Sequence, residues 1–297
     1  LQNSINTMLK RQFTDSDSIV SYDMQVVLNG SYDTLVAAPD AQKTVAERAE
    51  VAVSTLNYMK VTNTGSTNSS KRFETYIMVP ENADMLPNYI RLRDTSTGGV
   101  LSLPQNGAVI TKKLAESLGL SAGDSINVFV SDSYVVQVPI AAVAENYVFH
   151  YVFMTKEVYT ALFGANPGYN YIMAKFKSPL SGTQKEQLSK DLMSEYDITA
   201  VSYAEEAQQT FEHILDSLGY VVIILVVSAG LLSFIVLYNL SSININERIK
   251  EIATIKVLGF RKREVTAYIF RENLMLSVFG TVLGLIFGLA LHRMIIA

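Results

Sequence analysis

Two long apolar runs without a charged side chain constrain the fold of this chain most. The first covers Leu218–Tyr238 and the second Leu274–Leu291, with an extension of the second to Ile296. A helix of the first run is about 31 Å long, which matches the hydrocarbon core of a bilayer. The alternative is a pair of buried soluble helices, but two such runs seldom occur together in one soluble domain. We therefore expect transmembrane helices at residues 218–238 and 274–296.

The charges around these runs predict the orientation in the membrane. Residues 198–217 contain no Lys or Arg, whereas residues 239–273 contain seven, namely Arg248, Lys250, Lys256, Arg261, Lys262, Arg263 and Arg271. Basic loops remain in the cytoplasm. We therefore expect a multi-pass plasma-membrane protein with residues 239–273 in the cytoplasm and residues 1–217 outside, although Arg293 argues weakly for the opposite orientation.

The composition of the outside part restricts its partners and its compartment. Residues 1–217 hold 16 basic and 24 acidic side chains, whereas the rest of the chain holds 8 basic and 4 acidic ones. An acidic domain argues against nucleic acid as a partner. The chain contains no cysteine, so an outside domain has no disulfide to stabilise it, which favours a bacterial surface.

The first residues suggest that more chain lies upstream. The sequence begins at Leu1 without Met or a signal peptide, and an outside domain needs a segment to carry it across the membrane. Leu1, Ile5, Met8, Leu9 and Phe13 share one helical face. We expect this segment to be the outer end of an upstream membrane helix.

Residues 1–203 predict an α+β domain, because strand and helix patterns mix without strict alternation. The strand signals include Ser21–Leu28, Val51–Thr62 and Lys71–Val79. In Gly107–Val130 a short strand is followed by a helix capped by Thr111 and ending near Gly119, and then by a second strand. Tyr147–Met154 predicts another strand. For the aromatic run 147–153 within it, core packing is the default role and a partner surface is the alternative.

Two further helices are predicted in this domain by their caps. Asp40 can cap a short helix over Ala41–Glu50, and Thr155 caps a helix that extends to Phe163.

The pattern becomes helical at Ala204. Phe211, Ile214, Leu215 and Leu218 follow at helical spacing, and neither Gly nor Pro interrupts the chain before Gly219. We expect a stalk over residues 204–217 that continues into the first transmembrane helix. Such a stalk would couple the outside domain rigidly to the membrane.

The segment between the two runs predicts an amphipathic helix. Ile245, Ile249, Ile252 and Ile255 form a narrow apolar stripe, and Gly259 ends the helix. The basic residues 261–263 have either a topological role or a contact with anionic lipid or a partner. In the second run Gly280, Gly284 and Gly288 lie four residues apart, which predicts close packing against another membrane helix, with lipid-facing glycines as the alternative.

With these residues in view, the C-terminal third resembles the FtsX-like permease family, the MacB-type ABC transporter permeases. The similar segment is Asn239–Arg293. The positions of the family signature are occupied here by Glu247-Arg248, residues 250–253, residues 256–259 and Glu272. Lys250, Ala253 and Val257 depart mildly from it. Gly107–Val130 is similar to the family's outside segment, and the C-terminal half of the large Gram-positive permeases is similar in layout.

This resemblance implies a permease subunit of an ABC transporter with a MacB-like outside domain and mechanotransmission through the stalk. A separate ABC ATPase would dock on the connector, through Glu247, Arg248, Glu251, Ile252, Lys256, Leu258 and Gly259. The permease would export a lipid or peptide substrate or activate an extracytoplasmic protein. The expected partners are this ATPase, other transmembrane helices of the full-length protein and the lipid bilayer.

Other classes of function have less support. The chain has no P-loop, no nucleophile motif and no metal-ligand spacing, so we expect no enzyme activity and no cofactor in this chain. The main alternative is a membrane sensor or receptor subunit with an extracytoplasmic sensing domain. A sensor would more often continue into a cytoplasmic output domain than return to the membrane after 35 residues.

Overall fold

The computed structural model describes residues 7–15, 17–29, 37–64, 72–259 and 262–296. The chain divides into two compact units, an N-terminal domain (Leu1–Leu215) and a helical unit (Asp216–Ala297). The predicted residues Leu1 and Ile5 lie outside the described residues. So do residues 65–71 and residues 260–261 of the connector.

Six strands of the N-terminal domain close into a barrel. They are β2 (Ala49–Asn63), β3 (Phe73–Pro80), β4 (Ala108–Thr111), β5 (Ser125–Phe129), β6 (Val135–Ala144) and β7 (Tyr151–Phe153). The strand order is β3-β7-β4-β6-β5-β2, and β2 also pairs with β3, which closes the ring. The pairs β3–β7 and β4–β6 are parallel, and the other pairs are antiparallel.

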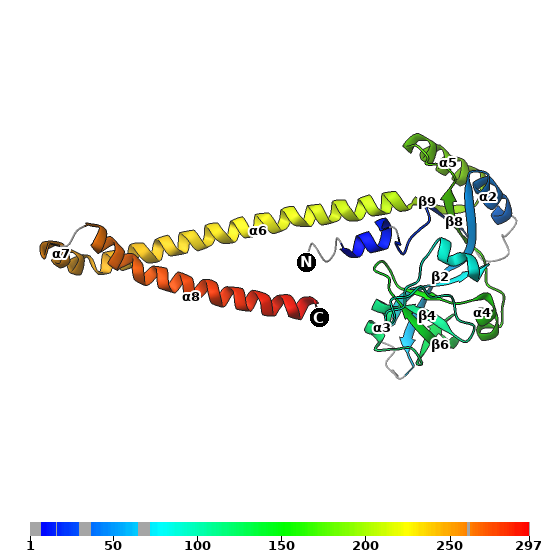
Figure 1. Cartoon of the computed structure of the whole chain (residues 1–297), viewed down its shortest axis with the longest axis horizontal. Coiled ribbons are helices and arrows are strands. Elements are labelled where there is room, and N and C mark those ends of the chain that lie inside the picture. Colours follow the sequence, from blue (N-terminus) through cyan, green and yellow to red (C-terminus); the bar gives the residue numbers. More distant parts are fainter. Residues whose placement is uncertain (1–6, 16, 30–36, 65–71, 260–261, 297) are drawn as a thin grey trace. The chain divides into compact units, whose positions relative to one another are not determined.

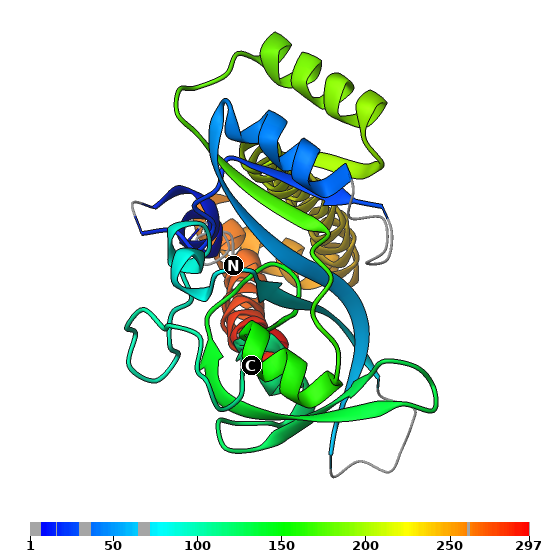
Figure 2. The same cartoon turned by 90° about the vertical axis from the view of Figure 1, so that its right-hand side faces the viewer.

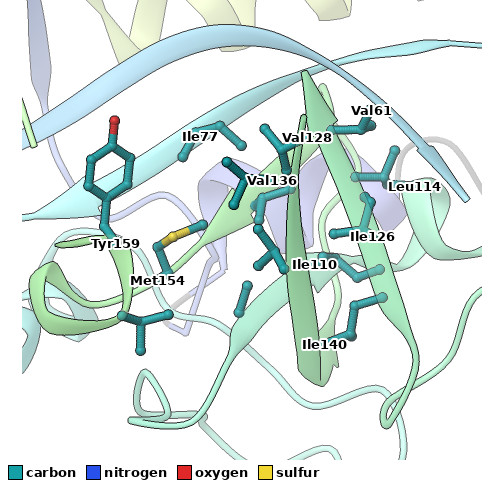
Figure 3. Packing of buried hydrophobic residues seen from close by; sticks show 14 of the residues in the cluster. Val61, Ile77, Ile110, Leu114, Ile126, Val128, Val136, Ile140, Met154 and Tyr159 are labelled. Carbon is teal, nitrogen blue, oxygen red and sulfur yellow. The ribbon is translucent and has the colours of Figure 1, made fainter. Parts of the chain in front are cut away.

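The barrel is filled by aliphatic side chains. Ile110, Ile126 and Ile140 come from three different strands and are at most 2% exposed, and Figure 3 shows them in one cluster. Helices α3 (Lys112–Leu118) and α4 (Lys156–Phe163) add Leu114 and Val158 to this cluster. Burial of these apolar side chains is the main source of stability for a domain without disulfides.

Three further strands extend the sheet beyond the barrel. The first half of β2 pairs with β8 (Tyr171–Phe176), which pairs with β1 (Met24–Leu28), and β1 pairs with β9 (Ile198–Tyr203). Helices α2 (Ala37–Ala46) and α5 (Gly182–Glu195) cover one face of this extension (Figure 2), where Val45, Leu188 and Leu192 pack on Val26 and Ile172.

A third cluster lies between the barrel strands and the extension. It joins Met173 of β8, Phe153 of β7 and Leu86 of the short helix η3 (Ala83–Asn88).

The N-terminal segment is helical at residues 7–14. Residues 7–9 lead into the π-helix η1 (Lys10–Thr14). The structure is therefore a mixed α/β domain, which agrees with the predicted class.

The helical unit contains most of α6 (Ala204–Glu247), followed by α7 (Ile249–Val257) and α8 (Lys262–Ile296). α6 is one continuous helix of 44 residues, as Figure 1 shows, so the prediction of a helix running from Ala204 into the apolar stretch is confirmed. The chain reverses direction around α7, and α7 contacts α8.

Most local predictions in the N-terminal domain are confirmed. Gly119 ends α3 in the left-handed conformation, with φ +65°, and Thr155 caps α4 by accepting a hydrogen bond from the Val158 amide. Three predictions were wrong in detail. Thr111 precedes α3, but its hydroxyl accepts a hydrogen bond from the Tyr151 amide instead of capping the helix. Asp40 lies in the first turn of α2 rather than before it, and only residues 151–153 of the aromatic run form a strand.

Candidate functional site: the connector and the apolar helices

The apolar part of α6 is exposed along its whole length. Val221, Leu231 and Val236 are between 52% and 60% exposed, and the other large apolar side chains of this stretch are similar. Among the described residues, α6 is the one helix that is both long and apolar enough to cross a membrane. In α8 the apolar stretch found among the described residues is Ser277–Leu291, which is shorter.

The connector helix α7 begins directly after α6, at Ile249. The Ile252 amide donates to the Arg248 carbonyl at 3.0 Å, and the Leu258 amide donates to the Thr254 carbonyl at 3.1 Å. Helical hydrogen bonding therefore continues from Arg248 to Leu258. Gly259 follows with φ +88°, a left-handed conformation that favours glycine, and this confirms the predicted helix end.

Helix geometry relates the seven predicted coupling residues to one another. Glu251 and Leu258 are seven residues apart, or about two turns, and therefore lie on one face together with position 247. Positions 248, 252 and 256 follow progressively further around the helix, so the predicted coupling residues extend over about half of its circumference. Glu251 is exposed, Ile252 is half-buried and Leu258 is 71% exposed. An exposed leucine beside an exposed carboxylate is a surface that a protein partner could cover. The structure contains no partner chain, so the docking role remains a prediction.

The three glycines of α8 have open space beside them. A Cβ built at Gly280, Gly284 or Gly288 would meet no atom within 4 Å among the described residues. Their spacing places them on one face of the helix, but no described element packs there. The predicted close packing against another membrane helix therefore also remains a prediction.

The aromatic run 147–153 divides between core and surface. Val152 and Phe153 are buried, whereas Phe149 is 64% exposed and has φ +60°, a conformation that non-glycine residues rarely adopt. The Phe149 ring contacts the Tyr76 ring edge-on, with 5.9 Å between the ring centroids. The Tyr76 ring also contacts the ring of Tyr58 of β2, with 5.3 Å between the ring centroids. The default expectation of core packing thus holds for part of the run only.

A buried polar contact links the N-terminal segment to the loop between β6 and β7. Gln12 is 3% exposed, and its amide nitrogen donates to the Asn146 side-chain oxygen at 3.0 Å. Its own side-chain oxygen accepts a hydrogen bond from the Tyr147 amide at 3.1 Å. Sequence reasoning missed this contact, because nothing in the pattern joins residues separated by 134 positions.

Comparison with known families finds a match in the C-terminal region. The model described as FtsX-like permease C-terminal matches residues 221–297. The C-terminal region is similar to FtsX-like permeases. This match covers the apolar part of α6, the connector α7 and all of α8, and it confirms the family resemblance for this region.

Among the described residues, no group of three or more His, Asp or Glu could hold a metal ion.

The N-terminal domain is similar at low identity to two solved domains. The periplasmic region of MacB from Actinobacillus actinomycetemcomitans aligns at 12% identity with a TM-score of 0.38, covering 65% of this chain and 94% of that chain. The extracellular domain of the ABC-type transporter YknZ from Gram-positive bacteria aligns at 14% identity with a TM-score of 0.35, covering 61% of this chain and 98% of that chain. No curated protein matches the chain. Likeness at this level assigns no function.

Proposed function

We propose that this chain is part of the membrane subunit of an ABC transporter, that residues 218–238 and 274–296 cross the membrane, and that residues 239–273 dock a separate ATPase. The observation that carries the proposal is the FtsX-like family match over residues 221–297. In this proposal ATP hydrolysis takes place on the partner chain. Its conformational cycle moves α6, and α6 passes the movement to the N-terminal domain.

The exposed apolar surface of the helical unit supports the membrane part of the proposal. Contiguous exposed apolar surface of this extent is unstable in water, whereas a helix satisfies all its backbone groups inside lipid. Leu225, Phe234 and Tyr238 of α6 are 63–68% exposed, and so are Leu285 and Phe287 of α8, at 64–68%. The second crossing rests on α8, a continuous helix of 35 residues whose apolar stretch is uncharged.

The orientation follows from charge. The seven basic residues between the two apolar stretches favour the cytoplasmic side, whereas residues 198–217, on the other side of the first stretch, contain no Lys or Arg. Any ATPase that uses cytoplasmic ATP would then meet the connector rather than the domain. The glycine face of α8 would pack against a membrane helix of the full-length protein or of a second permease subunit.

A sensor or receptor subunit is the second candidate. It would use the same domain and the same long helix, but its connector would bind a signalling protein. The family match favours the permease, because its model describes permeases. The two candidates differ in the protein that binds α7.

Co-purification of the full-length protein with its ATPase tests the proposal. Leu258→Asp and Glu251→Lys each change one residue of the proposed docking face. Val257→Asp is the matched control, because Val257 is 88% exposed but points about 100° away from Leu258 around the helix. We expect the first two variants to insert into the membrane and to lose the ATPase, while the control retains it. Normal association of both docking-face variants would remove the assignment.

A further inference from the structure

The N-terminal domain has a recess at the point where α6 begins. Its volume is about 570 Å³, and all of its lining residues belong to the N-terminal domain. The lining comes from the N-terminal segment, the end of β8, the first residues of α5 and the first turns of α6. The recess therefore touches both of the segments that lead into and out of this domain.

One part of the lining is apolar and held in place by neighbouring rings. Phe13 is half-buried, and its ring stacks on the ring of Phe211, with 6.1 Å between the centroids. Phe176 is also half-buried, and its ring lies 6.3 Å from that of Tyr203. Leu180 completes this part of the lining. A recess with such walls favours a ligand that carries apolar groups.

The other part of the lining is cationic. Arg91, Lys175 and Lys185 reach the recess from three separate parts of the chain, against two carboxylates, Asp23 and Glu205. The lining thus carries one more cationic than anionic side chain, in a domain whose overall charge is negative. A local cationic surface in an acidic domain requires an explanation.

The two carboxylates are already engaged. The Asp23 carboxylate accepts a hydrogen bond from the Phe176 amide at 2.7 Å. Glu205 pairs with Lys185 at 2.5 Å, and the Lys185 ammonium lies 5.4 Å from the centre of the Tyr203 ring. The Lys185 side chain is only 18% exposed, which strengthens its electrostatic contacts relative to those of a lysine in open water.

We propose that this recess binds an amphiphile with an anionic headgroup, which contacts Lys175 and Arg91 while the apolar part packs on Phe13, Phe176 and Leu180. The cations would hold the headgroup by charge-assisted hydrogen bonds. A small inorganic anion would use only half of the lining. A neutral apolar molecule would use only the aromatic and aliphatic part of the lining.

The position of the recess links binding to the long helix. Ala204, Glu205 and Gln208 of α6 line it, and the Ala204 amide donates to the Asp23 carbonyl at 2.9 Å. A ligand bound here would connect the first turns of α6 to β8 and α5. By binding one arrangement of these elements preferentially, it would bias the position at which α6 leaves the sheet. This consequence deepens the proposed function and rests on it.

The ligand could reach the recess from the bilayer or from solution. Gln208 precedes the apolar run at Leu218 by ten residues, which is about three helical turns. In the proposed topology the recess is therefore on the outer side, a short distance along the helix from the membrane. The chemistry is the same for a membrane lipid and for a soluble amphiphile, so the experiment must separate these two sources.

Photolabelling of the full-length protein in phosphatidylcholine nanodiscs tests the proposal. One arm includes a diazirine-bearing phosphatidylglycerol in the bilayer, and the other adds a diazirine-bearing octyl phosphate from solution. The neutral counterparts are a diazirine phosphatidylcholine and a diazirine octyl glucoside. We expect an anionic probe to label peptides around Phe13 or residues 176–185 about tenfold more than its neutral counterpart, as expected for charge-assisted contacts. The arm that gives this labelling identifies the source.

Matched variants make the test specific. Lys175→Gln and Arg91→Gln should each reduce the labelling about tenfold, the effect of one charge-assisted contact. Glutamine is used at position 175 because Lys175 lies opposite Glu50 in the β2–β8 pairing, where a new carboxylate would repel it. Lys156→Gln, at an exposed lysine of α4, should leave the labelling unchanged.

Two results would overturn the proposal: equal labelling by anionic and neutral probes in both arms, or labelling that both recess variants leave unchanged. Unchanged melting temperatures of the variants would show that they are folded. Co-purification of the ATPase is recorded on the same samples. A parent protein that is labelled in the recess but has no ATPase would contradict the proposed function and leave the binding site intact.

Discussion

Replacement of Gln12 by alanine should separate the N-terminal segment from the β6–β7 loop. The variant would remove both hydrogen bonds of this side chain and leave the Asn146 oxygen and the Tyr147 amide without their protein partners. Asn146 cannot turn away without cost, because its own amide nitrogen donates to the Phe149 carbonyl at 3.2 Å. Asn146 is 8% exposed, so water does not reach its side chain freely.

The magnitude follows from the two groups that are left unsatisfied. A buried polar group that loses its partner costs about 1–3 kcal/mol. Relaxation of an exposed loop would let water reach part of the site, so we expect about 2–4 kcal/mol for the pair. At about 2 kcal/mol, opening of the loop becomes roughly 30 times more frequent.

Hydrogen exchange measured by mass spectrometry is the appropriate assay for this variant. The peptide that contains Tyr147 should exchange at least roughly 30 times faster, an estimate from the lower end of this range, and the full-length protein in detergent should have a lower melting temperature. Arg11→Ala is the control, because Arg11 is 56% exposed and both of its contacts with this loop are long: an ion pair with Glu145 at 3.9 Å and a hydrogen bond to the Tyr147 hydroxyl at 3.4 Å. Such exposed pairs contribute about 1 kcal/mol or less. Parent-like exchange in Gln12→Ala would refute the proposed anchoring.

Three further predictions concern other parts of the chain. Gly119→Ala should destabilise the N-terminal domain by about 1 kcal/mol through backbone strain alone, because φ is +65° and no atom lies within 4 Å of the new methyl group. A denaturation midpoint equal to that of the parent protein would contradict this prediction. A hydrogen bond to Glu74 raises the pKa of Tyr58 to about 12, so this contribution to stability is complete below about pH 10 and is lost as the pH rises through 12. Glu74→Gln should return the pKa of Tyr58 toward its ordinary value in an NMR titration of labelled tyrosine, and no change would exclude Glu74 as the cause. Gly284→Leu should reduce assembly and activity of the permease, whereas parent-like behaviour would mean that the glycine face contacts only lipid.

Local signals in the sequence were sufficient for much of the fold. Alternating apolar residues identified β1, and a strand signal at residues 51–62 identified most of β2. The stop at Gly119 identified the end of α3, and the cap at Thr155 identified the start of α4. The uninterrupted helical pattern from Ala204 identified α6. These features depend on neighbours within a few residues, so a single sequence contains them.

Closure of the barrel could not be predicted in this way. β2 pairs with β8 along residues 49–54, with β3 along residues 54–61 and with β5 along residues 60–63. One alternating pattern is compatible with any of these partners, because pairing is decided by contacts between distant segments. The recess at the start of α6 is similar, since its lining extends from Phe13 to Gln208.

The aromatic run shows how tertiary structure overrides a local pattern. Its composition favours a strand, but only residues 151–153 pair with their neighbours. The Asn146 side chain holds the chain in a turn before them, through hydrogen bonds to the carbonyls of Val148 and Phe149. Phe149 is thereby exposed in a left-handed conformation, which costs about 1–2 kcal/mol for a residue other than glycine.

The central claim is that an ABC ATPase binds the connector, and site-specific photocrosslinking tests it most directly. A photoreactive phenylalanine analogue placed at position 258 of the full-length protein would be irradiated in native membranes, and the crosslinked partner identified by mass spectrometry. The same analogue at position 257 provides the control on another face of α7. Our account predicts a crosslink from position 258 to an ABC ATPase. A crosslink to a kinase or another signalling protein, with no ATPase, would contradict the permease and favour the sensor.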